Sequence, residues 1–282
     1  LGKSNTLSIR DSFTRYEQTG AGVGTLVLPE QSYNQTKLEN ALQISDTVVV
    51  NPRLINETHF QWRKVRNSQA ANSLAPAIIV QGAFQAGGNS AGSVQDHQDI
   101  FELQNYSTAT AGRHTIRFGA RLRAYRDANY TTSGSNGTYI FQSIDHYLAK
   151  KPDQYQATVI NNPLVRVLLF DASLFYQDDW RWKPNLTLSY GLRYEGQNRI
   201  RDHADWAPRF ALAWAPGHMG KTPPKTVLRA GYGWFYNRFT VPNSFGSASE
   251  APYIIQAIHQ NGLNQQSYVI NNPDFYDPAT PA

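Results

Sequence analysis

The sequence contains a set of arginines whose spacing can place them on one side of a strand. Arg117, Arg121 and Arg123 are two or four residues apart, and Arg126 and Arg229 complete this basic set. Successive side chains point to opposite faces of a strand, so the first three share a face. Guanidinium groups on one face can balance carboxylates on neighbouring strands or contact an anionic ligand. A nucleic-acid site needs clustered cations interleaved with aromatic rings, and the alternation argues against that interpretation.

A second set of polar residues combines both charge signs. Arg193 and Glu195 stand at alternate positions of one apolar–polar run, and Asp179 occupies the polar face of the run before it. Opposite charges on neighbouring strands are within reach of each other when their strands pair. Two interpretations stay open: these groups support the wall of the fold, or they line the path of a substrate.

No residue pattern in the chain points to an enzyme. Cysteine is absent, which excludes a disulfide framework, a thiol nucleophile, a Cys-ligated zinc site and an iron–sulfur cluster. The seven histidines show no metal-ligand spacing, and Asp202, His203 and Asp205 are interpreted as a solvated loop. Spacing nominates no Ser–His–Asp set. We expect no enzyme activity, no catalytic residue, no metal and no cofactor.

Long segments with a period of two residues form the framework that would position these side chains. The clearest segment spans His114 to Thr131, where Ile116 and Leu122 alternate with the arginines. Further strong runs begin at Leu186 and Leu228, and another occupies residues 170–180. Weaker runs lie near residues 5–17, 37–46, 53–65, 98–108 and 206–214. Together these patterns predict about nine strands.

Strand length and aromatic placement favour a membrane barrel over a soluble sandwich. Runs of ten or more residues exceed the roughly 5–6 of soluble strands and match the roughly 9–11 of a tilted membrane strand. The apolar faces carry aromatic side chains that suit the membrane interface. These interface aromatics are Trp180, Tyr190, Tyr194, Tyr232, Trp234 and Tyr236. The mean hydropathy of −0.51, with no apolar run near the ~20 residues of a membrane helix, excludes a helical membrane protein.

Connections of alternating length predict which side of the membrane each one occupies. Tight turns are expected at residues 51–52, 111–113 and 183–185, with a somewhat longer one at 216–225. Long polar connections are expected at residues 20–36, 67–96 and 132–166 and after 238, with a modest one at 197–205. Outer-membrane barrels combine short periplasmic turns with longer extracellular loops. Within the third long loop, residues 137–143 predict a short strand and Ser143 caps a short helix.

These features predict an all-β fold, specifically an antiparallel transmembrane β-barrel wall with long extracellular loops. About nine long strands make a partial wall of a larger barrel, because the strand number is odd and both chain ends look cut. We interpret residues 1–282 as one partial outer-membrane β-barrel domain.

Several motifs resemble the barrel of TonB-dependent outer-membrane receptors, in particular the Oar-like branch. The central hairpin motif runs through residues 175–180, 183–188 and 190–195. The flanking motifs are residues 112–119, 141–148 with 154–155, 207–217 and 227–236. The resemblance is strongest over residues 98–240 and looser elsewhere.

The resemblance implies a barrel of about 22 strands, closed by an N-terminal plug. It also implies ligand uptake energised through a TonB-type periplasmic protein, with a small molecule, peptide or glycan as ligand. The plug, the TonB contact segment and the N-terminal module are not visible in this sequence. The expected partners are therefore outer-membrane lipid, the energising protein and the ligand, with no nucleic acid.

The alternation nominates a set of lumen-facing residues for such a barrel. These are Arg117, Arg121, Arg123, Asp179, Arg193, Glu195 and Arg229. The principal hypothesis is a transport or receptor barrel in the bacterial outer membrane. The alternatives are an envelope structural or adhesion barrel without active transport, and a passive porin.

Overall fold

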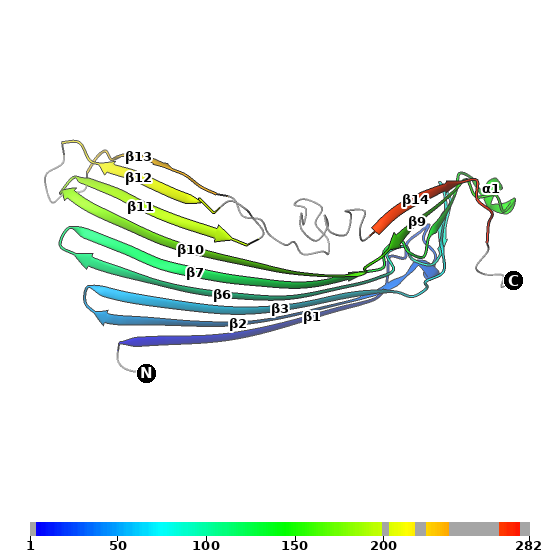
Figure 1. The fold of residues 1–282 in the computed structure, drawn as a ribbon, viewed down its shortest axis with the longest axis horizontal. Coiled ribbons are helices and arrows are strands. Elements are labelled where there is room, and N and C mark those ends of the chain that lie inside the picture. The colour runs from blue at the N-terminus through cyan, green and yellow to red at the C-terminus, as the bar shows by residue number, and fades with distance from the viewer. Residues whose placement is uncertain (1–3, 199–202, 218–223, 237–264, 277–282) are drawn as a thin grey trace.

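The computed structural model describes residues 4–198, 203–217, 224–236 and 265–276. Nine long strands form one antiparallel sheet, in which every strand pairs with its neighbours in chain order (Figure 1). They are β1 (Asn5–Ala21), β2 (Tyr33–Asn51), β3 (Leu54–Ala71), β6 (Ser93–Ala111), β7 (His114–Thr131), β10 (Leu164–Lys183), β11 (Leu186–Gln197), β12 (Trp206–Trp214) and β13 (Leu228–Gly233). The predicted fold class and the predicted number of nine strands are confirmed.

Several strands extend beyond the limits that the alternation predicted. Part of the loop expected at residues 67–96 is strand, because β3 and β6 stay paired from Leu54↔Ala109 to Ala70↔Ser93. Polar residues on both faces hide this extension from a hydrophobicity pattern. The backbone hydrogen bonds of the ladder do not depend on that pattern, so pairing continues past the apolar segment.

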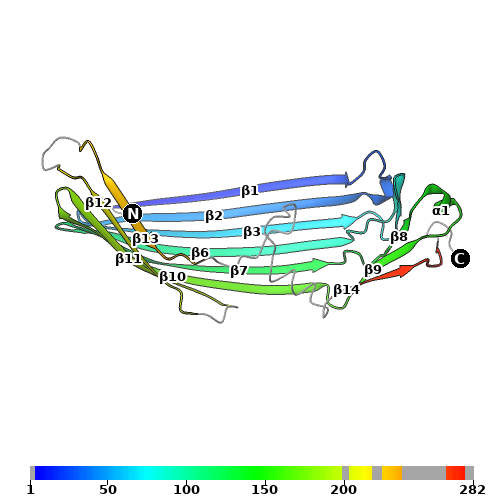
Figure 2. The same ribbon diagram turned by 90° about the horizontal axis from the view of Figure 1, so that it is seen from above.

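The tight turns gather at one end of the sheet (Figures 1 and 2). Strands β2 and β3, β6 and β7, and β10 and β11 are each joined by two residues. In the second of these turns Gly112 has a φ of +62°, a left-handed conformation that glycine adopts without steric cost. The turns predicted at residues 51–52, 111–113 and 183–185 are confirmed.

The long connections form a small second sheet at the other end (Figure 2). Its order is β14-β9-β8-β4-β5, with one parallel pair between β4 and β8. The bounds are β4 (Ala77–Val80), β5 (Phe84–Gly87), β8 (Thr138–Phe141), β9 (Gln154–Ile160) and β14 (Gln265–Asn271). Strand β14 lies in the segment after residue 238 that the sequence predicted as loop; its pairing with β9 supplies the backbone partners that fix it as a strand. Residues 237–264 lie outside the described residues.

We call this small sheet with its helical segments the loop module. Helix α1 (Ile144–Leu148) follows β8, and the 3-10 helix η1 (Pro29–Gln31) packs near β5. Ser143 caps α1 by accepting a hydrogen bond from the His146 backbone N–H, so the predicted short strand and capped helix are confirmed. Phe141 is fully buried at the centre, with Tyr147 and Phe275 packed edge-on at 5.3 Å. Among the described residues, no helix has the length and apolar character needed to cross a membrane.

The nine-stranded sheet has two chemically different faces. The outer face is the one that carries Phe118, Leu122 and Leu174, which are 43–58% exposed although they are apolar. The inner face is the opposite one and carries Arg117, Arg121 and the polar residues paired with them. Exposed apolar area of this extent on one face of a sheet marks contact with lipid.

Candidate functional site

The inner face holds a cluster of charges centred on Asp171 of β10. Asp171 is 4% exposed and lies directly opposite Arg123 of β7. The Arg123 Nε–H donates a hydrogen bond to Asp171 Oδ2 at 2.7 Å. Arg123 Nη2 is also 2.7 Å from the same oxygen. Arg121 Nη2 is 3.7 Å from Asp171 Oδ1. Two predicted arginines therefore meet on one carboxylate, which offsets much of the cost of burying these charges.

Polar side chains continue from this cluster across the inner face towards β2. Glu102 of β6 is opposite Arg123. The Gln104 side chain donates a hydrogen bond to the Glu102 carboxylate. His59 and Tyr106 are hydrogen-bonded at 3.0 Å and stacked. These residues line a hollow of about 370 Å³. Its walls offer donors and acceptors to a polar ligand.

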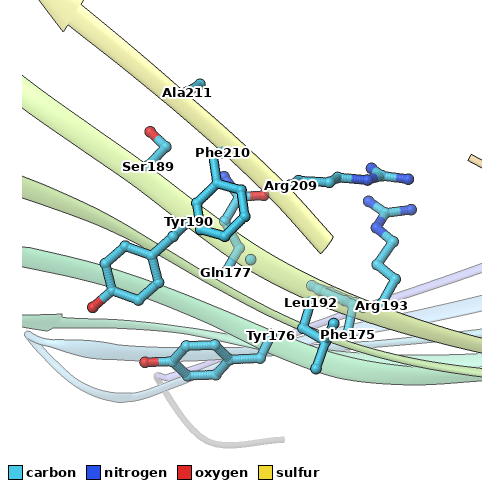
Figure 3. A pocket seen from close by; sticks show the side chains of 11 residues that line it. Phe175, Tyr176, Gln177, Ser189, Tyr190, Leu192, Arg193, Arg209, Phe210 and Ala211 are labelled. Atoms are coloured by element: carbon cyan, nitrogen blue, oxygen red, sulfur yellow. The ribbon is translucent and has the colours of Figure 1, made fainter. Parts of the chain in front are cut away.

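A second group of cations lies on the inner face near β11 and β12. Figure 3 shows Arg193 and Arg209 pointing to the same side of the sheet, away from Tyr176 and Tyr190. Arg193 lies over the ring of Phe175 at 5.5 Å, and Arg209 lies over Phe235 at 4.4 Å. Aromatic faces attract cations by their quadrupole, so these contacts hold the guanidinium groups in place.

The structure does not bring all the predicted lumen residues into one cluster. Arg117 is opposite Gln177, and Asp179 accepts a 3.4 Å hydrogen bond from that same glutamine. Glu195 is opposite Ser173, and Arg229 is opposite Ala213. All seven lie on the inner face, but among the described residues only Arg121 and Arg123 of this set share an ion-pair partner. Their functional role stays a prediction.

Two of the predicted interface aromatics surround a carboxylate near the tight turns. Asp178 of β10 is on the outer face yet only 2% exposed. The Tyr190 hydroxyl donates to it at 2.6 Å, and His114 Nδ1 lies 2.7 Å from the same oxygen. Trp180 stacks on His114 with ring centroids 5.5 Å apart. The carboxylate is thereby paired and shielded at the turn end of the lipid-facing surface.

Of the other predicted interface aromatics, Tyr232 is in register with Tyr190 through Phe210, whereas Tyr194, Trp234 and Tyr236 lie further from the tight turns. Tyr194 packs on Trp206 with centroids 4.8 Å apart. Tyr236 donates to the Trp206 carbonyl, and Trp234 Nε1 donates to the Tyr232 hydroxyl at 2.9 Å. Tyr194 is only four positions from Tyr190 along β11, about 14 Å at the rise of an antiparallel strand. Tyr190 and Tyr194 are therefore closer together than the two edges of an apolar band about 25 Å tall.

Comparison with known proteins identifies the family. The family model described as outer membrane beta barrel domain matches residues 1–203 and 197–281. The chain belongs to this family. It lies in the bacterial outer membrane, as the lipid-facing outer face requires. No curated protein matches the chain.

A solved structure with a similar fold is the outer membrane transporter YddB from Escherichia coli. The similarity covers 76% of this chain with a TM-score of 0.52 and 14% sequence identity. The chain spans 28% of the length of that transporter. At this identity the similarity establishes the fold of this outer-membrane barrel domain.

Near the loop end, the inner face of the barrel domain buries two neighbouring carboxylates. Asp96 of β6 and Asp127 of β7 are 0% and 4% exposed. Asp127 follows Arg126 directly on β7, and Asp96 comes from the neighbouring strand. Gln98 donates to Asp96 at 2.7 Å, and Asn67 donates to the same oxygen at 3.4 Å. No group of three or more His, Cys, Asp or Glu suited to a metal ion occurs in the described ranges.

The sequence prediction missed three residues of the barrel domain that organise these groups. Arg209 follows the alternation of 206–214 and could have been found from it. Asp171 belongs to a recognised polar face, but nothing local marked it as the partner of Arg123. Asp178 is a carboxylate at a position where the alternation predicts an apolar, lipid-facing side chain. Only its neighbours across the sheet explain it.

Proposed function

We propose that the chain is part of the wall of a TonB-dependent, Oar-like transport barrel, in which a ligand moves past the inner face. The observation that carries this proposal is the hydrogen bonding of the largely buried Arg121 guanidinium group. Its Nε and Nη2 atoms are buried without a hydrogen bond among the described residues, since Asp171 Oδ1 is 3.7 Å from Nη2, and the side chain as a whole is 26% exposed. Buried donors of this kind need an acceptor. The exposed part of the guanidinium group can donate to a plug segment or an anionic ligand in the lumen, which would add to the long contact with Asp171.

The distribution of charge on the inner face supports the same assignment. Arg117, Arg193 and Arg229 form no ion pair with a described carboxylate, and each faces the lumen. A cationic lining in a low-dielectric wall attracts anionic groups. The proposed ligand is therefore a small molecule, peptide or glycan with at least one anionic group. The proposal assigns no catalytic step to the chain.

The loop module would also suit a second candidate, an adhesion or structural barrel. The loop module has its own buried core, formed by Ile78, Val80, Tyr139 and Phe141. A packed module of this kind gives an envelope protein a rigid outer surface for contact with another macromolecule. A transport barrel can use the same module to capture its ligand, so this core does not decide between the two.

The test uses the intact protein purified from outer membranes. We expect it to bind the periplasmic domain of the TonB-type protein of its own bacterium and to show no steady conductance in planar bilayers. Steady conductance without that binding would establish a passive porin. Absence of both would favour the adhesion or structural barrel. Arg121→Met in the intact protein is expected to admit ion current, because it removes the lumen donor that contacts the plug.

A further inference from the structure

The outer face carries a group of cations at the end of its apolar band, on the side of the long loops. Lys64, Arg126 and Arg166 are all exposed, and they come from β3, β7 and β10. Arg66 of β3 lies among them. We call these four residues the outer cation patch. It is separate from the inner face, because side chains at these positions point to the opposite side of the sheet.

The strand register places the patch directly beyond lipid-facing apolar residues. On β7 the outer residues from Ile116 to Ala124 are apolar, and Arg126 is the next one. On β10 the outer residues from Tyr176 to Leu168 are apolar, and Arg166 is the next one. On β3 the residue before Lys64 on the outer face is Trp62, which stacks on Phe101 of β6 with ring centroids 6.4 Å apart. Lys64 therefore also follows an apolar side chain on the side away from the tight turns. Three strands therefore change from apolar to cationic at a common boundary.

The height of this boundary matches the surface of the outer leaflet. His114, at the tight turn, and Arg126 are twelve positions apart on β7. At about 3.4 Å per residue and a tilt of roughly 35–45°, the vertical distance is about 29–33 Å. An apolar band about 25 Å tall fits between them. The patch then lies at headgroup level, on the side that long loops mark as extracellular.

The charge of the patch is only partly neutralised within the wall. Asp99 of β6 receives a bidentate contact from Arg66 Nη2 at 2.9 and 3.0 Å. In the described part of the chain, Lys64, Arg126 and Arg166 form no ion pair with a carboxylate. A hollow of about 500 Å³ lies between Arg66, Arg126 and Arg166. Two unpaired cations, Arg126 and Arg166, thus border an open hollow at the headgroup level, beside the paired Arg66 and Asp99.

We propose that the outer cation patch binds the phosphate groups of a lipid in the outer leaflet. Arginine pairs with phosphate through two parallel hydrogen bonds, and cations at a membrane surface attract anionic headgroups. The exposed side chains of Leu168 and Phe170, 46% and 42% exposed, continue from Arg166 along the strand. They offer the acyl chains an apolar surface directly below the phosphates. A free phosphate ion would use the cations and leave this surface unused.

The test measures lipid retained by the intact protein in nanodiscs, by native mass spectrometry. The discs contain phosphatidylcholine with diphosphorylated lipid A or with lipid A from which both phosphates are removed. We expect retention of the phosphorylated lipid only. The variant K64Q/R126Q/R166Q is expected to weaken this binding about a hundredfold, since each cation near an anionic surface is worth about fivefold.

Two further variants separate the proposal from general charge loss and from misfolding. R53Q/K151Q/K225Q removes three exposed cations elsewhere and is expected to retain the lipid. K64R/R126K/R166K keeps the charges and is expected to retain most of the binding. Equal retention by the neutralised and unchanged proteins would overturn the proposal. So would displacement of the lipid by a few millimolar inorganic phosphate, which would indicate a site for the free ion.

Discussion

The Tyr190 hydroxyl donates a 2.6 Å hydrogen bond to Asp178, its direct partner on the neighbouring strand. Both residues are on the lipid-facing side of the sheet, where a carboxylate without partners would be costly. His114, on the strand at the other side, contacts the same carboxylate oxygen. Three strands, β7, β10 and β11, are therefore tied together by one acidic group at the turn end of the wall.

We predict that Tyr190→Phe lowers the stability of the barrel. The substitution keeps the ring and removes one of the two donors to a buried carboxylate. Urea unfolding of the intact protein in lipid vesicles should show a lower midpoint. Tyr194→Phe is the matched control, because the ring contact of Tyr194 with Trp206 does not need the hydroxyl. Equal midpoints for Tyr190→Phe and the unchanged protein would contradict the structural role of this bond.

The Arg123–Asp171 pair on the inner face should show strong energetic coupling. Removing Arg123 by Arg123→Met leaves Asp171 buried with only the longer contact to Arg121, and we expect a loss of about 2–3 kcal/mol. Asp171→Leu should cost a similar amount. A double-mutant cycle measured by urea unfolding is expected to give a coupling of about 1–3 kcal/mol. Additive effects would mean that the two side chains do not act as a pair.

Acid should weaken the turn of the loop module that Asp153 closes. The Gln142 backbone N–H donates to Asp153 at 2.7 Å and lowers the pKa of this carboxyl below its ordinary 3.8, and the His146 contact lowers it further, while desolvation opposes both. Because the pKa of Asp153 is lower in the folded state, its stabilisation is present at pH values above the pKa of the unfolded chain. That stabilisation is lost as the pH falls through the pKa of the folded state. Hydrogen exchange of residues 138–155, corrected for intrinsic rates, should therefore accelerate below about pH 3.8.

Asp153→Asn provides the control for this pH dependence. The amide oxygen can still accept a bond but does not titrate in this range, so protection of the segment should be weaker at neutral pH and flat on acidification. An identical acid-induced loss in the variant would assign the effect to another group.

Glycine at position 137 should be irreplaceable for steric reasons. Gly137 has a φ of +76°, and a Cβ there would overlap the Tyr155 hydroxyl. Gly20 has a φ of +63° but open space around it. We expect Gly20→Ala to cost about 1–2 kcal/mol from the left-handed backbone alone, and Gly137→Ala to cost clearly more. Hydrogen exchange of β8 and β9, and of β1 and β2, measures the two effects. Similar costs would argue against the close contact with Tyr155.

The sequence by itself determined the class of fold, the number of strands in the main sheet and the side on which most of their residues lie. Alternation is a local property with a period of two, so Arg117, Arg121 and Arg123 had to share a face wherever their strand was placed. The turns at Gly112 and Pro184 are also local, since short hairpins depend on a few residues. The strand ends were less predictable, because the paired ladder continues through polar residues such as Asn67 and Asp96.

Only the tertiary structure decided which side chains meet across the sheet. Asp171 is 48 residues from Arg123 in the chain, and Asp178 is 64 residues from His114. Their contacts depend on the register between strands, which the backbone ladders and turn lengths fix together. The outer cation patch arises in the same way, from four cations on three strands brought to nearly one height. A pattern read along one strand carries no information about that height, so this surface could not be found from the sequence alone.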